Sequence, residues 1–232
     1  MKISIIIPCF NEDRTISQCI ENIHNNKLEG HDYEIIVVDD ASSDNSNEII
    51  QKLFEEKKIF KYISKKINEG KGSAINDALP FISGEITIIQ DADLEYHPLE
   101  YYNLIHPIIH HRADVVYGSR YMTTGAKRVL LFWHGIANRI LTLFSNMVTN
   151  LYLTDMETGY KVFKSEHLKG LKIEEKRFGF EPEITIKLAK KKLFFYEVGI
   201  AYHGRGYDEG KKIGIKDAFR ALYCLVKYTI KS

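Results

Sequence analysis

Three carboxylates at alternate positions follow a run of β-branched apolar residues: Asp91, Asp93 and Glu95 in the stretch ITIIQDADLEYHP. In an extended strand, alternate side chains point to the same side, so these three groups can face one cation. Proteins bind Mg2+ and Mn2+ through a few carboxylates together with phosphate oxygens of a substrate. One acid alone would be enough to cap the helix expected near Pro98. The pattern therefore favours a divalent metal site formed by all three.

Other ion-binding and phosphate-binding motifs fit less well. An EF-hand needs Gly at the sixth loop position and Glu at the twelfth, where this chain has Tyr96 and Tyr102. The stretch NEGKGSAIN lacks P-loop spacing, and PCFNE stands where a dinucleotide fold would carry GxGxxG. Asp39 and Asp40 end another apolar run. They either cap the next helix or accept hydrogen bonds from a nucleotide, and the residues alone leave both open.

Buried strands alternate with helices through the first half of the chain. Strands are expected in ISIIIPCF, YEIIVVDD, FKYISK, GEITIIQDAD and ADVVYGSR. Continuous apolar strands of this kind indicate an α/β fold with a Rossmann-like, mostly parallel sheet and helices on both faces. In such sheets ligands bind beyond the carboxyl ends of the strands. We therefore expect the polar residues that follow each strand to converge along one edge.

The second half predicts a helical C-terminal elaboration. Residues 127–153 predict one or two amphipathic helices with little charge, and the tail IKDAFRALYCLVKYTIKS predicts an apolar-faced helix carrying Lys and Arg. These helices either lie on a membrane surface or pack on protein, including in a homodimer. We expect a single domain over 1–232 with two parts, 1–124 and 125–232.

Composition excludes several classes of protein. The chain has 232 residues, 44% of them apolar, and a net charge of +1, so no global field attracts nucleic acid. Its three scattered cysteines form no disulfide framework and indicate a reducing cytoplasm. No apolar run approaches the roughly 20 residues that span a bilayer. We expect a cytoplasmic protein.

Several motifs, taken in order, resemble those of the family-2 glycosyltransferases. They are IIIPCFNE, VVDDASSDNS, NEGKGSAIN, QDADLEYHP, YGSRY and TDMETGYKVFK, across residues 5–164. The chain is most similar to the dolichol-phosphate mannose synthase and polyprenyl-phosphate glycosyltransferase branch. The resemblance implies a GT-A fold, a nucleotide-sugar donor, Mg2+ or Mn2+, and transfer with inversion. It also implies that 1–124 is the nucleotide-sugar-binding part of the domain and 125–232 the acceptor and lid part. It also implies a polyprenyl-phosphate acceptor, and hence peripheral contact with the inner membrane face or a membrane protein.

The resemblance also implies roles for individual residues, by motif position. Asp91 would lie near the ribose and donor and Asp93 would be the central metal ligand, while Glu95 replaces the Gln of many relatives. Arg205 falls at a donor-binding position of the mannose synthases, and Lys211 shares its basic, Gly-rich loop. That loop is either a lid over the pyrophosphate or a solvated charged turn. The residues implied to bind the nucleoside are Pro8, Phe10, Glu12 and Asp39.

The acceptor determines which further residues matter. A lipid phosphate is already a nucleophile and needs cations, for which Arg120 matches the resemblance closely and Arg128 and Arg139 match it loosely. A hydroxyl acceptor needs a carboxylate base, for which Glu181 and its neighbour Glu183 are candidates. These two acids are alternatively favourable first-turn residues of a helix.

These observations predict a metal-dependent hexosyltransferase that uses GDP-mannose or a UDP-hexose and a polyprenyl (dolichyl or undecaprenyl) phosphate. Three other functions are alternatives to this hexosyltransferase. One is transfer to a sugar hydroxyl in surface-polysaccharide or glycoprotein assembly. Another is a sugar-1-phosphate nucleotidyltransferase, which would need glycines that PCFNEDRT lacks. The last is a nucleotide-sugar-binding scaffold without turnover.

Overall fold

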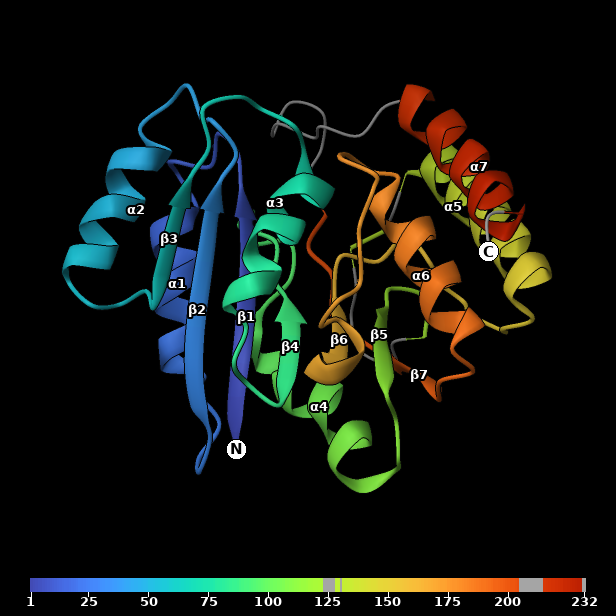
Figure 1. The fold of residues 1–232 in the computed structure, drawn as a ribbon, viewed down its shortest axis with the longest axis horizontal. Coiled ribbons are helices and arrows are strands. Elements are labelled where there is room, and N and C mark those ends of the chain that lie inside the picture. The colour runs from blue at the N-terminus through green and yellow to red at the C-terminus, as the bar shows by residue number, and fades with distance from the viewer. Residues whose placement is uncertain (123–127, 130, 205–214, 231–232) are drawn as a thin grey trace.

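The computed structural model describes residues 1–122, 128–129, 131–204 and 215–230. Within these residues, seven strands form one sheet with the order β3-β2-β1-β4-β6-β5-β7 (Figure 1). The strands are β1 (Lys2–Cys9), β2 (Asp32–Asp39), β3 (Lys61–Ser64), β4 (Ile86–Ile89), β5 (Val115–Ser119), β6 (Lys161–Lys164) and β7 (Phe195–Gly199). The α-helices are α1 (Ile16–Asn25), α2 (Ser46–Glu55), α3 (Lys71–Ala78), α4 (Tyr101–His110), α5 (Phe132–Thr149), α6 (Phe180–Lys190) and α7 (Ile215–Ile230).

The sheet is mostly parallel, as predicted. β1 pairs in parallel with β2 and β4, β2 with β3, and β5 with β7. β6 lies antiparallel between β4 and β5. The sequence did not predict this strand, because the segment KVFK begins and ends with lysine. Lys161 is nevertheless almost fully buried, which the apolar pattern of an ordinary buried strand does not anticipate.

Helices cover both faces of the sheet, as the alternation of strands and helices in the sequence predicted. Alternate residues of β1 divide between two cores because successive side chains of a strand point to opposite faces. Ile5 and Ile7 join the core that contains residues of α1, α2 and α4. Ile6 joins the core that contains residues of α3, α5, α6 and α7. The nucleotide-binding residues expected after β1, β2 and β4 are thus held by strands packed on both sides.

The predicted helical C-terminal elaboration is also present. α5, α6 and α7 pack against one another beside the sheet (Figure 1). In the part of the chain that the structure describes, no helix has the length and apolar character needed to cross a membrane.

Candidate active site

A cleft of about 1020 Å³ opens at the carboxyl ends of the strands. Its lining combines residues that follow β1, β2, β4, β5 and β7, so the predicted convergence at one edge is found. The register explains this, because Cys9 at the end of β1 pairs with Asp39 at the end of β2. Eight residues predicted for the site line the cleft: Pro8, Phe10, Glu12, Asp91, Asp93, Glu95, Arg120 and Glu181.

The acidic segment after β4 is a turn, which corrects the sequence-based geometry. β4 ends at Ile89, and Leu94 adopts a left-handed φ of 62°, so strand alternation does not extend through the carboxylates. The backbone N–H of Glu95 donates to Asp93 Oδ1 at 3.1 Å, and Tyr202 donates its hydroxyl to Glu95 Oε2 at 2.7 Å. Among the described residues, no three His, Cys, Asp or Glu side chains are arranged to hold a metal. The three carboxylates are therefore not gathered around one point.

Asp91 is engaged by a lysine that the sequence did not single out. Lys71, the first residue of α3, places its Nζ 2.8 Å from Asp91 Oδ1 and 3.3 Å from Glu181 Oε1. Burial alone would lower the pKa of Lys71, but the two carboxylates outweigh burial and raise the pKa. Gly159 leaves room for this arrangement, since a Cβ there would lie 2.2 Å from Asp91 Oδ2. Lys71 is thus a fixed cation on the floor of the cleft.

Glu181, the predicted base, is buried beside a second carboxyl group. It is 3% exposed, and its Oε2 has no hydrogen-bond partner in the structure. Glu157 also lines the cleft, and its Oε1 is likewise buried without a partner. Burial and the nearby Glu181 raise the pKa of Glu157 well above its usual value.

Glu183, the other base considered, has a structural role. Its carboxylate accepts hydrogen bonds from the backbone N–H groups of Glu174 and Glu175, at 2.8 and 2.7 Å. It also forms an ion pair with Lys187. These contacts hold the chain that enters α6, so Glu183 stabilises the fold. It is not among the residues that line the cleft.

Arg120 is held by an aspartate buried behind it. Its Nε and Nη2 donate to Asp155 Oδ2 and Oδ1, both at 2.7 Å, and its backbone N–H donates to Oδ2 at 3.1 Å. Asp155 is 0% exposed and also accepts from Asn138 Nδ2 at 2.8 Å. Burial would raise the pKa of Asp155, but Arg120 lowers it below its usual value. The guanidinium therefore has a fixed orientation and stays charged. Its Cζ lies 5.2 Å from the centre of the Tyr202 ring.

The acids after β2 have different surroundings. Asp40 lines the cleft and accepts hydrogen bonds from the backbone of Glu69 and Gly70, which positions the turn before α3. Asp39 is fully buried, accepts from Asn47 Nδ2 at 2.9 Å, and keeps Oδ1 without a hydrogen-bond partner. Asp39 is not among the residues that line the cleft, and its predicted nucleoside contact stays a prediction.

Of the remaining predicted cations, Arg128 and Arg139 do not line the cleft. Arg128 donates from Nη1 to the carbonyl oxygen of Gly204 at 2.7 Å. The Cζ of Arg139 lies 5.9 Å from the centre of the Tyr121 ring. Arg205 and Lys211 lie outside the residues that the structure describes.

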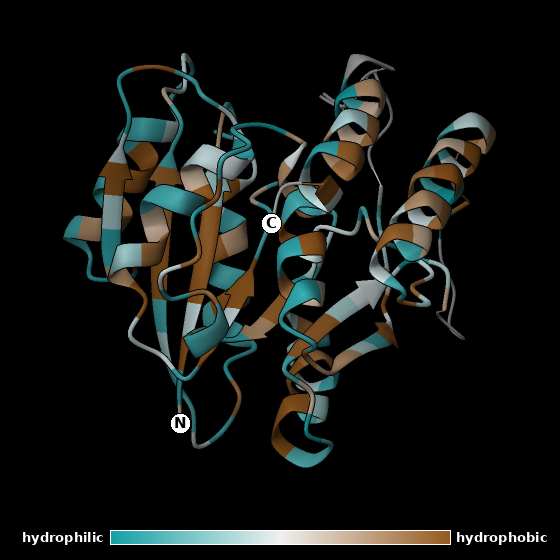
Figure 2. Ribbon diagram, turned by 45° about the vertical axis from the view of Figure 1, so that its right-hand side comes forward, coloured by the Kyte–Doolittle hydropathy of each residue, from teal (hydrophilic) through white to brown (hydrophobic). Residues whose placement is uncertain are grey.

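One wall of the cleft is apolar. It comes from α5 and α7, two helices far from the acidic turn in sequence (Figure 1). Trp133 and Phe219 line it and are also strongly exposed, at 76% and 70%. Hydrophobic positions recur along these helices (Figure 2), and their exposed members include Phe132, Leu143, Phe144, Met147, Tyr223, Val226 and Ile230. The cleft is therefore polar at the strand ends and apolar towards the helices.

Sequence reasoning missed three residues that hold the site together. They are Lys71, Asp155 and Tyr202, and each contacts a residue that was predicted. The motifs NEGKGSAIN and TDMETGYKVFK contain the first two, so position within a motif was the only signal available. Their partners are brought near only by the folded sheet.

The chain is similar in sequence to two named enzymes. The chain is 28% identical over 230 residues to a dolichol-phosphate mannosyltransferase of Pyrococcus furiosus, covering 98% of this chain and 64% of that protein. It is also 28% identical over 243 residues to a UDP-N-acetylglucosamine–dolichyl-phosphate N-acetylglucosaminyltransferase of Methanococcus voltae, covering 97% and 94%. The chain thus spans about two thirds of the first relative and most of the second.

The fold also matches a solved structure. Glucosyl-3-phosphoglycerate synthase of Mycobacterium tuberculosis, crystallised with Mn2+, UDP and phosphoglyceric acid, superposes with a TM-score of 0.75 at 20% identity. The match covers 99% of this chain and 78% of that one, which confirms the predicted GT-A fold. Residues 4–172 match the sequence profile described as Glycosyl transferase family 2. The chain belongs to glycosyl transferase family 2 and is a glycosyltransferase.

Proposed function

We propose that this glycosyltransferase moves a hexose from a nucleotide sugar to a polyprenyl phosphate. The donor side of the cleft consists of Pro8, Phe10, Glu12, Asp91, Asp93 and Glu95, and the acceptor side consists of Arg120 with the apolar walls of α5 and α7. The observation that carries the proposal is the amphipathic cleft itself. A polyprenyl phosphate has an anionic head and an apolar chain, and the acceptor side offers a fixed guanidinium beside exposed apolar helices.

The surroundings of Glu181 favour a phosphate acceptor over a hydroxyl. A general base must reach the proton that it removes, within about 2.6–3.2 Å. Glu181 is 3% exposed, and its Oε1 is already paired with the Lys71 ammonium at 3.3 Å. One oxygen of the expected base is therefore occupied by an ammonium group instead of a sugar hydroxyl. A phosphate oxygen needs no base and is attracted to Arg120. The names of the two dolichyl-phosphate relatives support the same acceptor.

The donor side fits a divalent ion bound together with a diphosphate. Asp93 and Glu95 line the cleft as neighbouring hard oxygen ligands, and these would hold Mg2+ or Mn2+. Bound there, the ion would supply positive charge to the departing diphosphate. The related fold crystallised with Mn2+ and UDP supports this assignment. Lys71 keeps Asp91 oriented toward the donor, and the nucleoside would lie near Pro8, Phe10, Glu12 and Asp39.

The apolar helices would bring the protein to its acceptor. Their exposed aromatic and aliphatic side chains fit the boundary between lipid headgroups and acyl chains. In this arrangement the phosphate reaches Arg120 while the polyprenyl chain stays in the bilayer. We therefore propose peripheral association with the membrane through α5 and α7.

Donor binding tests the proposal first. Calorimetry with GDP-mannose, UDP-glucose and UDP-N-acetylglucosamine, each with and without Mn2+, should show Mn2+-dependent binding of one donor. The Asp93→Ala variant should lose this binding and keep its stability, because Asp93 is partly exposed in a turn. Wild-type protein that binds no donor, even with polyprenyl phosphate in vesicles, would contradict the proposal.

A further inference from the structure

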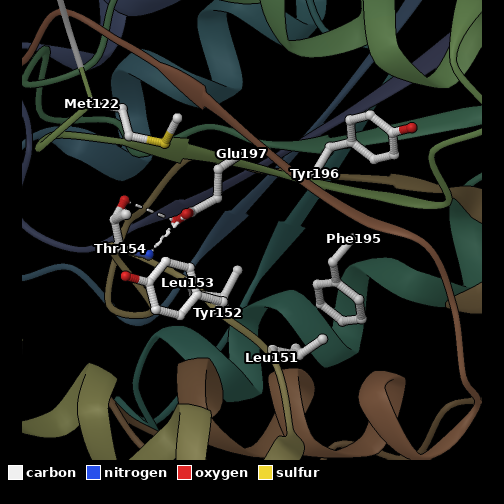
Figure 3. A pocket seen from close by; sticks show the side chains of 8 residues that line it. All are labelled: Met122, Leu151, Tyr152, Leu153, Thr154, Phe195, Tyr196 and Glu197. Atoms are coloured by element: carbon white, nitrogen blue, oxygen red, sulfur yellow. Dashed lines mark hydrogen bonds between the residues drawn. The ribbon is translucent and has the colours of Figure 1, made fainter.

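A second cavity lies beside the edge strand β7. It has a volume of about 430 Å³ and shares no lining residue with the cleft. Segment 151–154 and the first residues of β7 form its walls, and Glu197 projects into it toward Thr154 (Figure 3). Its neighbours Leu151, Leu153 and Phe195 are apolar. Burial raises the pKa of Glu197 above its usual value, and hydrogen-bond donors oppose this shift.

The hydrogen-bond donors of Glu197 belong to Thr154 and to Asp155, the aspartate that is paired with Arg120. Its Oε1 accepts from the N–H of Thr154 at 3.0 Å, from the N–H of Asp155 at 3.1 Å and from the Thr154 hydroxyl at 3.2 Å. Its Oε2 accepts from the N–H of Thr154 at 2.8 Å. The peptide that carries Asp155 is therefore held on one side by Glu197, while the Asp155 side chain holds Arg120 on the other.

We propose that Glu197 is a positioning residue for glycosyl transfer, which fixes Asp155 and thereby aims Arg120 at the acceptor phosphate. This inference rests on the proposed function, because it needs Arg120 to contact the acceptor. Asp155 has no exposed surface and cannot be oriented by solvent, so its direction depends on its protein contacts. Shifts of about 1 Å in such a group can cost about 100-fold in rate.

The test compares Glu197→Ala and Glu197→Gln with a matched control, Glu34→Gln. Glu34 is more deeply buried than Glu197, and like it accepts from backbone N–H groups, those of Ser83 at 2.5 Å and Gly84 at 3.1 Å, but it lies outside the cleft lining. Each variant is assayed for kcat and KM with polyprenyl phosphate, and for donor affinity by calorimetry, at a temperature where it is folded.

The Glu197→Ala variant should lose about 10-fold to 100-fold in kcat/KM for the acceptor and keep donor affinity within about twofold. The glutamine variant should lose less, and Glu34→Gln should change neither value. Formate or acetate, which the cavity can admit, should partly restore the alanine variant. Should the alanine variant fail to fold, the glutamine variant carries the same comparison.

Two results would overturn the inference. One is an unchanged kcat/KM in folded Glu197 variants, and the other is an equal loss of donor affinity and acceptor turnover, as a general structural defect would give. Failure of the proposed function gives a different result. An Arg120→Lys variant with wild-type acceptor kinetics would remove Arg120 from the acceptor site, whatever Glu197 does.

Discussion

The proposed donor and acceptor sides of the cleft are built by different means. Apart from Pro8, which lies in β1, the donor-side residues follow β1 and β4, so the register of the sheet brings them together. The acceptor side depends on buried pairs between distant segments: Arg120 and Asp155 are 35 residues apart, and Glu197 and Thr154 are 43 apart. A substitution on the acceptor side should therefore cost stability and activity together. A substitution on the donor side should cost binding alone.

The largest effect is expected for Arg120→Met. It leaves the Asp155 carboxylate buried without its cation, which should cost about 3–5 kcal/mol of unfolding free energy and remove transfer. Urea unfolding and an acceptor assay measure the two losses. The control is Arg139→Met, since Arg139 is exposed and contacts the Tyr121 ring. An Arg120→Met protein of wild-type stability would contradict the difference drawn between the two sides.

A smaller loss is expected for Gly159→Ala, where the two sides meet. The new Cβ would lie 2.2 Å from Asp91 Oδ2 and 2.7 Å from Tyr96 Cε2, so the carboxylate must move. We expect a loss of about 1–3 kcal/mol in unfolding free energy and weaker donor binding in calorimetry. Gly135→Ala in α5 is the matched control, because a Cβ there meets nothing within 4 Å. Equal donor affinity in both variants would show that Asp91 is free to relax.

The pH dependence of stability should separate Glu157 from ordinary surface acids. In the folded protein its pKa is raised to about 8 from 4.5, so the native state holds an extra proton between these values. Wild-type stability from this group therefore falls as pH rises through that window, by at most about 1.4 kcal/mol per pH unit. The Glu157→Gln variant has no ionisable carboxyl group at this position, so its stability lacks this pH dependence.

The stability of Glu157→Gln relative to wild type should accordingly increase between pH 5 and pH 8 in urea unfolding. The control is Glu166→Gln, whose side chain is 73% exposed and whose relative stability should stay flat. If the stability of Glu157→Gln relative to wild type did not change with pH, the Glu157 carboxyl group would be ionised in the folded protein.

The smallest effect is expected for Arg139→Met itself. An exposed cation away from the cleft lining should change stability by less than about 0.5 kcal/mol. Transfer should stay within about threefold of wild type, since one rim charge contributes little. Acceptor kinetics in vesicles measure this. A loss as large as that of Arg120→Met would place Arg139 in the acceptor site, as the sequence first suggested.

Much of the fold could be predicted because its signals are local. Strand and helix periodicities are read from adjacent residues, and the apolar runs that end in Asp39 and Ile89 mark β2 and β4. β6 was missed because it is short and places Lys161 inside the protein, where the ammonium donates to the carbonyl oxygens of Met156 and Thr158. Such compensation between a buried charge and its partners leaves no periodic pattern in the sequence.

The sequence identified residues that line the cleft, but not the contacts that hold them. Motif positions identified Asp91, Asp93 and Arg120, but not the turn that separates Asp91 from the other acids, because the turn depends on a left-handed Leu94. Lys71 and Asp155 could not be paired with their partners, since many charged residues compete for each contact in a chain of this composition. The burial of Glu181 likewise depends on how α6 packs, which its sequence does not specify.

The most direct test of the central claim is the chemical identity of the acceptor. The protein is incubated with Mn2+ and the nucleotide sugar that it binds, and offered either polyprenyl phosphate or the corresponding alcohol. We expect a glycosyl phosphate with inverted anomeric configuration, seen by mass spectrometry and NMR. Glu181→Gln should retain transfer within about tenfold, less than the 10²–10⁴ that a general base contributes. Transfer to the alcohol alone, abolished by Glu181→Gln, would contradict it.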